Sequence, residues 1–432
     1  MELKKYKKKR ITPQGWKEVT LADAFNTSSG ATPLSTEASY YENGTIPWIN
    51  SGELASPYIY GTTNFISQAG FENSSTEIYP IDTVLVAMYG ATAGKASLLK
   101  MEACTNQAIC AILPNKDYSS TFLKYSIDTL YDHLVGLSSG SARDNLSQAE
   151  LKKLKLIMPP TKDEQNKLVS ILALIDRKIE LNRAINQNLE AMAKQLYDYW
   201  FVQFDFPNEE GKPYKSSGGE MVWNKKLKRE IPKGWNISLI KDIATTYSGG
   251  TPQSTNIEYY NNGEIAWINS GELNSPIITK TTNYITKCGL ENSSAKLYPS
   301  NSILVAMYGA TAGKVSLLTF EACSNQAVCG IIPTIENMLY YVYFHISSLY
   351  SHFITLSTGS ARDNISQNTI KNILLPIPTR NILKLFDEKI GSIYQMIVNN
   401  YQQIDSLTKQ RDELLPLLMN GQVSVNSDLS DD

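Results

Sequence analysis

Two long segments of the chain carry apolar residues at alternating steps of four and three positions. The first covers residues 161–206 and has neither Gly nor Pro between Thr161 and Phe201, and the second covers residues 380–420. Such heptad-like spacing is typical of coiled-coil helices. We therefore predict a central coiled-coil helix at 161–206 and a distal one at 380–420. The alternative is that each long helix packs only on its own domain.

The apolar seams of the two segments match in length and phase at an offset of 218 residues. An antiparallel pairing that places Leu168 opposite Leu418 makes every seam residue face another one, and Asn186 then faces Asn400. A buried Asn pair lowers stability but selects one register and orientation. The predicted seam consists of Leu168, Leu172, Ile175, Ile179, Asn182, Asn186, Leu189, Ala193, Leu196 and Trp200 in the central helix, and of Phe386, Ile390, Ile393, Ile397, Asn400, Ile404, Leu407, Arg411, Leu414 and Leu418 in the distal helix.

The remaining chain has shorter and more mixed patterns. The runs Thr83 to Ala87 and Ala108 to Leu113 are rich in strand-forming residues and are bounded by Gly, Pro and Asn. Residues 118–137 carry apolar positions at helical spacing and predict one helix. We expect irregular, loop-rich domains of mixed α/β (α+β) class.

These patterns occur twice. Adding 219 to a residue number between Gly15 and Pro159 leads to its equivalent in a second copy, without any insertion. Residues 43–57 match 262–276 at 12 of 15 positions, and 84–99 match 303–318 at 14 of 16. The period is far longer than the roughly 20–50 residues of a solenoid repeat and indicates a duplicated domain. The expected fold therefore has two copies of one domain, separated by two long antiparallel helices, with internal pseudo-twofold symmetry.

The repeat and the long helices together divide the chain. The polar segment 207–230, rich in Gly, Ser and Lys, reads as a connector, and the tail after Gly421 is expected to be disordered. The predicted division is a first globular domain at 1–160, the central helix at 161–206, the connector at 207–230, a second globular domain at 231–379, the distal helix at 380–420 and the tail at 421–432.

Composition narrows the classes of function. The 432 residues include five Cys and three His, and the net charge is −2. No apolar run approaches the roughly 20 residues of a membrane helix, and no apolar segment follows the charged N-terminus. We expect a cytoplasmic protein with reduced thiols and no metal site. The recurring pair Cys104/Cys110 is expected to be buried as small apolar residues. A DNA-binding face would have to be local, because the overall charge is balanced.

The sequence "MYGATAGK" stands at 88–95 and again at 307–314. A P-loop has four residues between its first Gly and its Gly-Lys, and Ser or Thr after the Lys. Here only three residues separate Gly90 from Gly94, and Lys95 is followed by Ala96. We therefore expect a tight strand-to-strand or strand-to-helix turn in which glycines supply positive φ angles.

Several polar loops recur with this turn, and none of them contains a recognisable catalytic constellation. Their amide, hydroxyl and single basic groups suit contacts to phosphates and base edges. A salt bridge between Arg143 and Asp144 is the structural alternative, and Trp48 and Trp267 are expected in the core. The candidate DNA-binding residues are Thr32, Lys95, Ser141, Arg143 and Asn145 in the first copy, and Thr251, Lys314, Ser360, Arg362 and Asn364 in the second.

Several stretches carry a resemblance to a known family. They are "SGGTP…YYNNGEIAWINSGEL" at 248–273, the "MYGATAGK" and "GSARDN" blocks, "LKLIMPPTKDEQNKLVSILALID" at 154–176, and "DFPNEEGKPYKSSGGEMVWNKKLKREIPKGW" at 205–235. With them the chain resembles, over nearly its whole length, the specificity subunit of type I restriction–modification systems. The distal helix departs from the pattern, because it lacks the Glu164-Gln165 pair at the start of the central helix. The two helix starts therefore need not make the same contact with a partner subunit.

The resemblance implies a DNA reader that is not itself an enzyme. Each globular domain would be a target recognition domain, and the paired helices would set the distance between the two. The implied partners are double-stranded DNA, two methyltransferase subunits and two restriction subunits. S-adenosylmethionine, ATP and Mg would belong to those partners, and adenine methylation would follow recognition of a bipartite target.

Two other functions stay open at this point. The first is a pseudo-symmetric nucleotide-dependent enzyme that uses both GATAGK loops, and the second is a scaffold with no role on DNA. If the resemblance holds, nearly identical domains in opposite orientations predict a palindromic or near-palindromic target with a central gap. They also predict that residues 1–206, expressed alone, can pair through the central helix.

Overall fold

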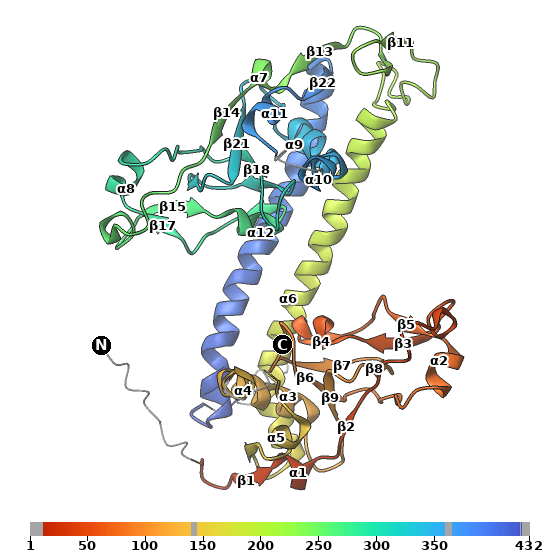
Figure 1. Ribbon diagram of the computed structural model, residues 1–432, viewed down its shortest axis with the longest axis vertical. Coiled ribbons are helices and arrows are strands. Elements are labelled where there is room, and N and C mark those ends of the chain that lie inside the picture. The colour runs from red at the N-terminus through yellow and green to blue at the C-terminus, as the bar shows by residue number, and fades with distance from the viewer. Residues whose placement is uncertain (1–11, 140–144, 359–364, 424, 426–432) are drawn as a thin grey trace. The chain divides into compact units, whose positions relative to one another are not determined.

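The computed structural model describes residues 12–139, 145–358, 365–423 and 425. The chain forms two compact units, one of residues 1–180 with 405–432 and the other of residues 181–404. Each unit contains one copy of the repeat and a part of both long helices (Figure 1).

The first unit is built on a five-stranded sheet of order β2-β9-β6-β7-β4 and a three-stranded sheet of order β5-β3-β8, with β1 and β10 paired antiparallel. Its elements before the long helix are β1 (Lys17–Thr20), α1 (Leu21–Ala24), β2 (Thr27–Ser29), η1 (Ala38–Tyr40), β3 (Ile46–Ile49), η2 (Ser51–Ala55), β4 (Tyr58–Ile59), β5 (Phe65–Ile66), α2 (Gln68–Glu72), β6 (Val84–Ala87), β7 (Ala96–Leu99), β8 (Cys104–Thr105), β9 (Ile109–Ile112), α3 (Ser120–Asp128), α4 (Tyr131–Ser139), α5 (Gln148–Lys152) and β10 (Lys155–Met158).

The central strands β6 and β9 are buried along their whole length. Successive side chains of a strand point to opposite faces of the sheet. Accordingly, Val84 and Val86 join the apolar cluster that contains Phe122 of α3, whereas Leu85 and Ala87 join a second cluster. The continuous apolar run in the sequence therefore reflects a strand covered on both faces.

The prediction of one helix over 118–137 is wrong, because α3 ends at Asp128 and α4 starts at Tyr131. The break turns α4 toward the GATAGK turn. There the buried Leu134 lies against Gly94, where an added Cβ would stand 3.2 Å from the Cβ of Leu134.

The second unit repeats this topology. Its sheets have the orders β14-β21-β18-β19-β16 and β17-β15-β20, and β13 pairs with β22. Its elements are β11 (Met221–Asn224), β12 (Arg229–Pro232), β13 (Asn236–Leu239), α7 (Ile240–Ile243), β14 (Ala244–Ser248), η4 (Ile257–Tyr259), β15 (Ile265–Ile268), η5 (Ser270–Asn274), β16 (Ile277–Ile278), β17 (Tyr284–Ile285), α8 (Lys287–Glu291), β18 (Ser302–Ala306), β19 (Val315–Leu318), β20 (Cys323–Ser324), β21 (Val328–Pro333), α9 (Leu339–Ser348), α10 (Tyr350–Thr358), α11 (Gln367–Lys371) and β22 (Leu374–Ile377).

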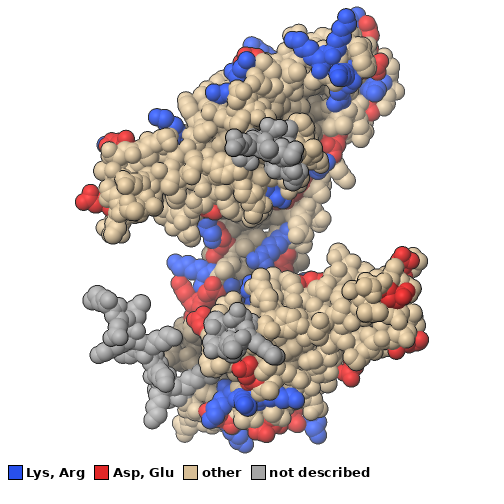
Figure 2. Space-filling model, in the orientation of Figure 1, with Lys and Arg blue, Asp and Glu red and all other residues tan. Residues whose placement is uncertain are grey.

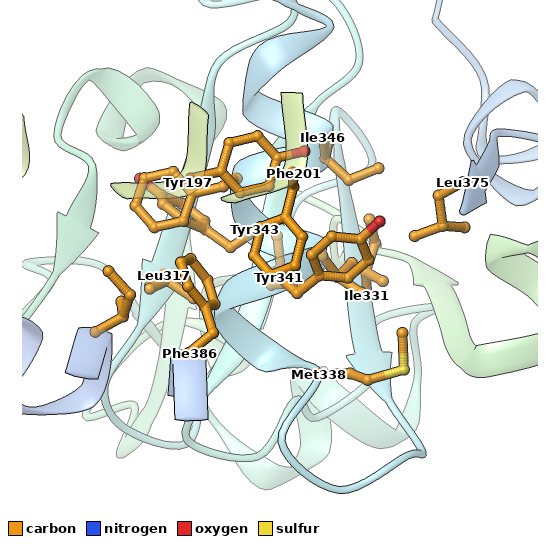
Figure 3. Packing of buried hydrophobic residues seen from close by; sticks show 14 of the residues in the cluster. Tyr197, Phe201, Leu317, Ile331, Met338, Tyr341, Tyr343, Ile346, Leu375 and Phe386 are labelled. Atoms are coloured by element: carbon orange, nitrogen blue, oxygen red, sulfur yellow. The ribbon is translucent and has the colours of Figure 1, made fainter. Parts of the chain in front are cut away.

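An aromatic cluster fixes the end of the central helix to the second unit. The rings of Tyr197, Phe201, Tyr341 and Phe386 gather there (Figure 3), with the ring centroid of Phe201 4.7 Å from that of Tyr341 and 4.8 Å from that of Phe386. Aromatic pairs at this spacing add to the stabilisation from burial.

The connector contains regular structure, since β11 and β12 form an antiparallel hairpin. Before the connector begins, Phe204 takes a positive φ of 66°, which ends the helical conformation. Phe206 then stacks on Trp235, with 5.3 Å between the ring centroids. The helical conformation thus ends before residue 206, because the chain turns back to bury these rings.

The two long helices are α6 (Lys162–Tyr197), extended by the π-helical turn η3 (Asp198–Val202), and α12 (Arg380–Met419). In the second unit Asn400 Nδ2 donates to Asn186 Oδ1 at 2.8 Å, and the ring of Trp200 lies 5.7 Å from that of Phe386. Contacts at higher numbers in α6 thus meet lower numbers in α12, so the helices run antiparallel in this unit.

The first unit holds the opposite ends of the same helices. Arg411 Nη1 lies 3.1 Å from Asp176 Oδ1, and Leu168 shares an apolar cluster with Leu414 and Leu418. Here too, the start of α6 lies beside the end of α12. Among the described residues, no helix combines the length and the apolar character that crossing a membrane requires.

Candidate nucleic-acid interface

The GATAGK turn joins the antiparallel strands β6 and β7. Gly90 and Gly94 have φ angles of 84° and 82°, and their equivalents in the second unit have 87° and 79°. The N–H of Gly94 donates to Ala87 O, and the N–H of Lys95 donates to Thr92 O, each at 2.9 Å. Two turn amides are therefore satisfied internally, and the chain continues as a strand. This confirms the prediction of a strand-to-strand turn.

The turn is tied to the loop that contains "INSGEL". Thr92 Oγ1 donates to Ser51 O at 2.7 Å, and in the second unit Thr311 Oγ1 donates to Ser270 O at 2.8 Å. On its other side, Leu146 N donates to Met88 O at 2.8 Å. The segment that follows the first GSARDN block thus lies next to the turn.

The "SGATP" loop joins the same group through Trp48, which is buried and donates its indole N–H to Ala31 O at 3.0 Å. In the second unit the half-buried Trp267 donates to Gly250 O, also at 3.0 Å. Both tryptophans hold the loop. Trp48 lies in the core as predicted, whereas Trp267 is only partly buried and packs at the edge of its apolar cluster.

A threonine and a glutamine project from this loop group in each unit. Thr32 Oγ1 donates to Gln107 Oε1, and Thr251 Oγ1 donates to Gln326 Oε1. All four residues are exposed. Because the hydroxyl donates to Oε1, the Nε2 amide group of each glutamine, for which the described residues provide no hydrogen-bond partner, can donate to a ligand.

Neither glutamine was singled out from the sequence, although both stand in blocks that recur, "EACTNQA" at 102–108 and "EACSNQA" at 321–327. The exact recurrence of Asn-Gln-Ala was the available signal. The neighbouring asparagines are also paired in each unit: Asn106 Nδ2 donates to Asn50 Oδ1, and Asn325 Nδ2 to Asn269 Oδ1, both at 3.3 Å.

The predicted basic residues occupy the edge of this group. Lys95 and Lys314 are half-buried, and Lys314 Nζ lies 5.1 Å from the ring centroid of Tyr350. Asn145 is exposed. The other candidates, Ser141, Arg143, Ser360, Arg362 and Asn364, lie outside the described residues.

Charge is distributed unevenly over the second unit. Figure 2 shows lysine and arginine gathered over the β11–β12 hairpin and few charged side chains over the sheet region on this face. The hairpin contributes Lys225, Lys226 and Lys228 from its turn and Arg229 from the start of β12. The side chains whose hydrogen bonds join the loop group of the first unit are amides and hydroxyls, namely Thr32, Asn50, Thr92, Asn106 and Gln107. Such groups suit contacts to base edges.

Four of the cysteines are buried, Cys104, Cys110, Cys323 and Cys329, and Cys288 is exposed. Burial raises the pKa of the Cys110, Cys323 and Cys329 thiols to about 12, and that of Cys104 to about 11. Reactivity requires the thiolate, so these four act as small apolar residues. In the described part of the chain, no three His, Cys, Asp or Glu side chains are grouped so that they could hold a metal ion.

The two residues of the Glu164-Gln165 pair at the start of α6 differ in burial. Gln165 is fully buried; its Oε1 accepts from Ser119 N at 2.8 Å, and its Nε2 donates to Pro159 O at 3.1 Å. Gln165 therefore fastens the helix to its own domain. Glu164 is exposed. The equivalent of Gln165 in the second unit is the buried Leu383.

Comparison with known proteins gave consistent results. The model of the family described as "Type I restriction modification DNA specificity domain" matches residues 13–191 and 232–414. The chain is 29% identical over 422 residues to the type I restriction enzyme MjaIX specificity subunit of Methanocaldococcus jannaschii, across 96% of this chain and 94% of that protein. It is 27% identical to the HindI specificity subunit of Haemophilus influenzae, across 68% and 74% of the two chains.

A crystal structure of a type I restriction–modification S subunit from M. genitalium has a similar fold. The TM-score is 0.59 at 14% sequence identity, across 95% of this chain and 97% of that one.

Proposed function

This chain belongs to the family of type I restriction–modification DNA specificity domains, and from that premise we propose that it is the subunit that recognises the DNA sequence. In this proposal each repeat reads one half of a bipartite target. The chain performs no methylation or cleavage itself and directs partner subunits to do so.

The observation that carries the proposal is the duplicated loop group. Four loops distant in sequence are joined by the same hydrogen bonds in both units, and each group presents an exposed glutamine held by a threonine. Glutamine can form two hydrogen bonds with the N6 and N7 edge of adenine in the major groove. We propose that Gln107 and Gln326 each contact an adenine of their half-site.

The proposed partners are double-stranded DNA, two methyltransferase subunits and two restriction subunits. ATP and Mg are assigned to those subunits, because neither GATAGK turn has the length or the hydroxyl of a P-loop. S-adenosylmethionine, as the methyl donor, is assigned to the methyltransferase subunits. The proposed location is the cytoplasm, where a protein of this kind meets its DNA.

The GATAGK turn supplies a specific reason to prefer this function over that of a nucleotide-dependent enzyme. A P-loop places its amides at the N-terminus of a helix. Here the turn leads into strand β7 and uses the amides of Gly94 and Lys95 internally.

The test is to express the chain in a host that lacks adenine methylation, with and without a methyltransferase subunit of the same system, and to map methylated adenines by single-molecule sequencing. Methylation at one defined motif is expected only when both proteins are present. A methyltransferase that modifies the same motif without this chain would overturn the proposal. ATP hydrolysis or methyl transfer by the pure chain would overturn the assignment of a non-catalytic role.

A further inference from the structure

The end of α12 meets the first unit at a buried cluster of charged groups. Asp176 and Lys124 are 1% and 3% exposed. Lys124 Nζ lies 2.9 Å from Asp128 Oδ2 and 3.5 Å from Asp176 Oδ2. Arg411 Nη1 lies 3.1 Å from Asp176 Oδ1, and Tyr125 donates its hydroxyl to Asp176 Oδ2 at 2.6 Å. Both oxygens of this buried carboxylate are therefore satisfied, one of them by the distal helix.

The equivalent place in the second unit is aromatic. The repeat offsets pair Lys124 with Tyr343 and Asp176 with Tyr394. The rings of Tyr343 and Tyr394 lie 5.8 Å apart. The residue equivalent to Arg411 is Ala193, which is fully buried in the same apolar cluster as both tyrosines. The two helix ends have thus diverged into one charged and one apolar junction.

This divergence affects what can pair with the first unit. If the central helix of a second copy took the place of α12, it would bring Ala193 to the position of Arg411. Asp176 would lose its cation from the opposite helix while staying buried. Lys124 and Tyr125 would still contact Asp176 Oδ2, but Oδ1 would have lost the guanidinium that satisfies it. A buried carboxylate oxygen without its partner is destabilising, because it is poorly solvated.

Side-chain size leads to the same conclusion. Leu418 and Met419 are 1% and 8% exposed in the apolar cluster of the first unit. Their equivalents in a second central helix would be Trp200 and Phe201. Protein cores are close-packed, so the larger rings would force neighbouring side chains out of their preferred conformations.

The polar residues at the middle of the seam do not discriminate between the distal helix and the central helix of a second copy. By the same offset, Asn182 of one central helix would face Asn186 of the other. An amide would meet an amide, as it does between Asn186 and Asn400. Only the residues near the ends of α6 and α12 therefore distinguish the two possible partners of the first unit.

We propose that the Asp176–Arg411 ion pair, with the aliphatic end of α12, selects the distal helix as the partner of the first recognition domain and excludes the central helix of a second copy. The two halves of the chain are then complementary and not interchangeable. This goes against the expectation that residues 1–206 pair well with themselves. It does not depend on the proposed DNA-binding function.

The test starts from the folded full-length protein with a protease site inserted before Gly211, in an exposed turn of the connector. The cleaved protein is unfolded in denaturant and refolded, and native mass spectrometry counts mixed and like-with-like pairs of the two fragments. We expect the ratio of mixed to like-with-like pairs to exceed its random value on the order of 100-fold. Arg411→Ala should reduce this excess, whereas Lys409→Ala, which removes an exposed cation from the same helix, should preserve it.

Ala193→Arg supplies the missing cation to the central helix and should raise the share of pairs between two N-terminal fragments. Random reassortment of the wild-type fragments, or an Arg411→Ala mixture identical to the Lys409→Ala mixture, would overturn the proposal. For variants that do not refold after cleavage, a double-mutant cycle of Asp176→Asn and Arg411→Met in the intact chain replaces this readout. Additive shifts in melting temperature there would overturn it as well.

Discussion

At the residue scale, small polar side chains arrange the candidate reading surface. The hydroxyl of Thr32 orients Gln107, and the hydroxyl of Thr92 ties the GATAGK turn to Ser51. Each bond joins loops that are far apart in sequence, and each recurs in the second unit. A glutamine whose amide oxygen already accepts a hydrogen bond loses less conformational entropy when it binds a base edge.

We predict that Gln107→Leu weakens recognition of one half-site only, and that Gln326→Leu weakens the other. Leucine keeps most of the side-chain volume and removes the amide, so the expected loss is about 1–3 kcal/mol for a bidentate contact. Binding is measured by fluorescence anisotropy on duplexes with a substitution in one half at a time. Gln68→Leu, at an exposed position in α2, serves as the control. An equal loss on all duplexes would contradict base recognition by these residues.

A second residue-scale prediction concerns His345. Its half-buried ring lies between the hydroxyl of Tyr197 and the carbonyl of Leu374, both at 3.3 Å. Burial lowers the pKa of His345 from 6.5 to about 4. The unfolded chain therefore takes up a proton at a higher pH than the folded one. This contribution to stability is fully present above pH 6.5 and is lost as the pH falls toward 4.

The expected loss amounts to at most about 3 kcal/mol. Thermal unfolding at about pH 7.5 and about pH 5 measures it. His345→Gln should flatten the dependence of melting temperature on pH in this interval, and His352→Gln, at an exposed position, should not. An unchanged pH dependence in the His345→Gln variant would show that other groups cause it.

At the element scale, the long helices combine an apolar seam with a few polar positions. Asn186 is 3% exposed and bonded to Asn400, and Asn182 Nδ2 donates to Gln403 Oε1 at 3.2 Å. Buried amides in such a seam favour the one register in which they meet.

We predict that Asn186→Leu or Asn400→Leu alone lowers stability by about 1–3 kcal/mol, because each removes the amide–amide hydrogen bond and leaves one polar side chain in the seam without that partner. The double leucine variant should melt at a higher temperature than the wild type and should permit slipped registers. Differential scanning calorimetry gives the stability. Cysteines introduced at Leu189 and Ile397 report the register by crosslinking. A double variant that is less stable than either single one would contradict this account.

At the scale of the whole molecule, the duplication is the dominant feature. The two units share strand order, turn geometry and loop hydrogen bonds, whereas their junctions with the long helices differ. The recognition loops have stayed alike while the helix ends have become distinct. This pattern is expected if both domains recognise similar bases and if the central helix pairs only with the distal helix.

We therefore predict that the methylated motif is an interrupted palindrome or near-palindrome. Two copies of one reader in opposite orientations would contact the same bases on the two strands. Mapping of methylated adenines in cells that contain the methyltransferase subunit and this chain checks it. Two unrelated half-sequences would contradict this prediction and leave the family assignment unaffected.

The sequence by itself determined the duplication, the two long helices with their apolar seams, and a tight turn at 88–95. The matching phase of the two seams also predicted the Asn186–Asn400 contact. These features are periodic or local, so the identities of neighbouring residues are sufficient to specify them. The family resemblance rested on the same blocks, and the family match bears it out.

Only the tertiary structure decided the break between α3 and α4, the folding of the connector into a hairpin, and the pairs Thr32–Gln107 and Asp176–Arg411. The members of these pairs are 75 and 235 positions apart. No local preference brings such residues together. Their meeting depends on how strands and helices pack once the chain has collapsed, because burial of the surrounding apolar surface, and not the polar pair itself, supplies most of the favourable free energy.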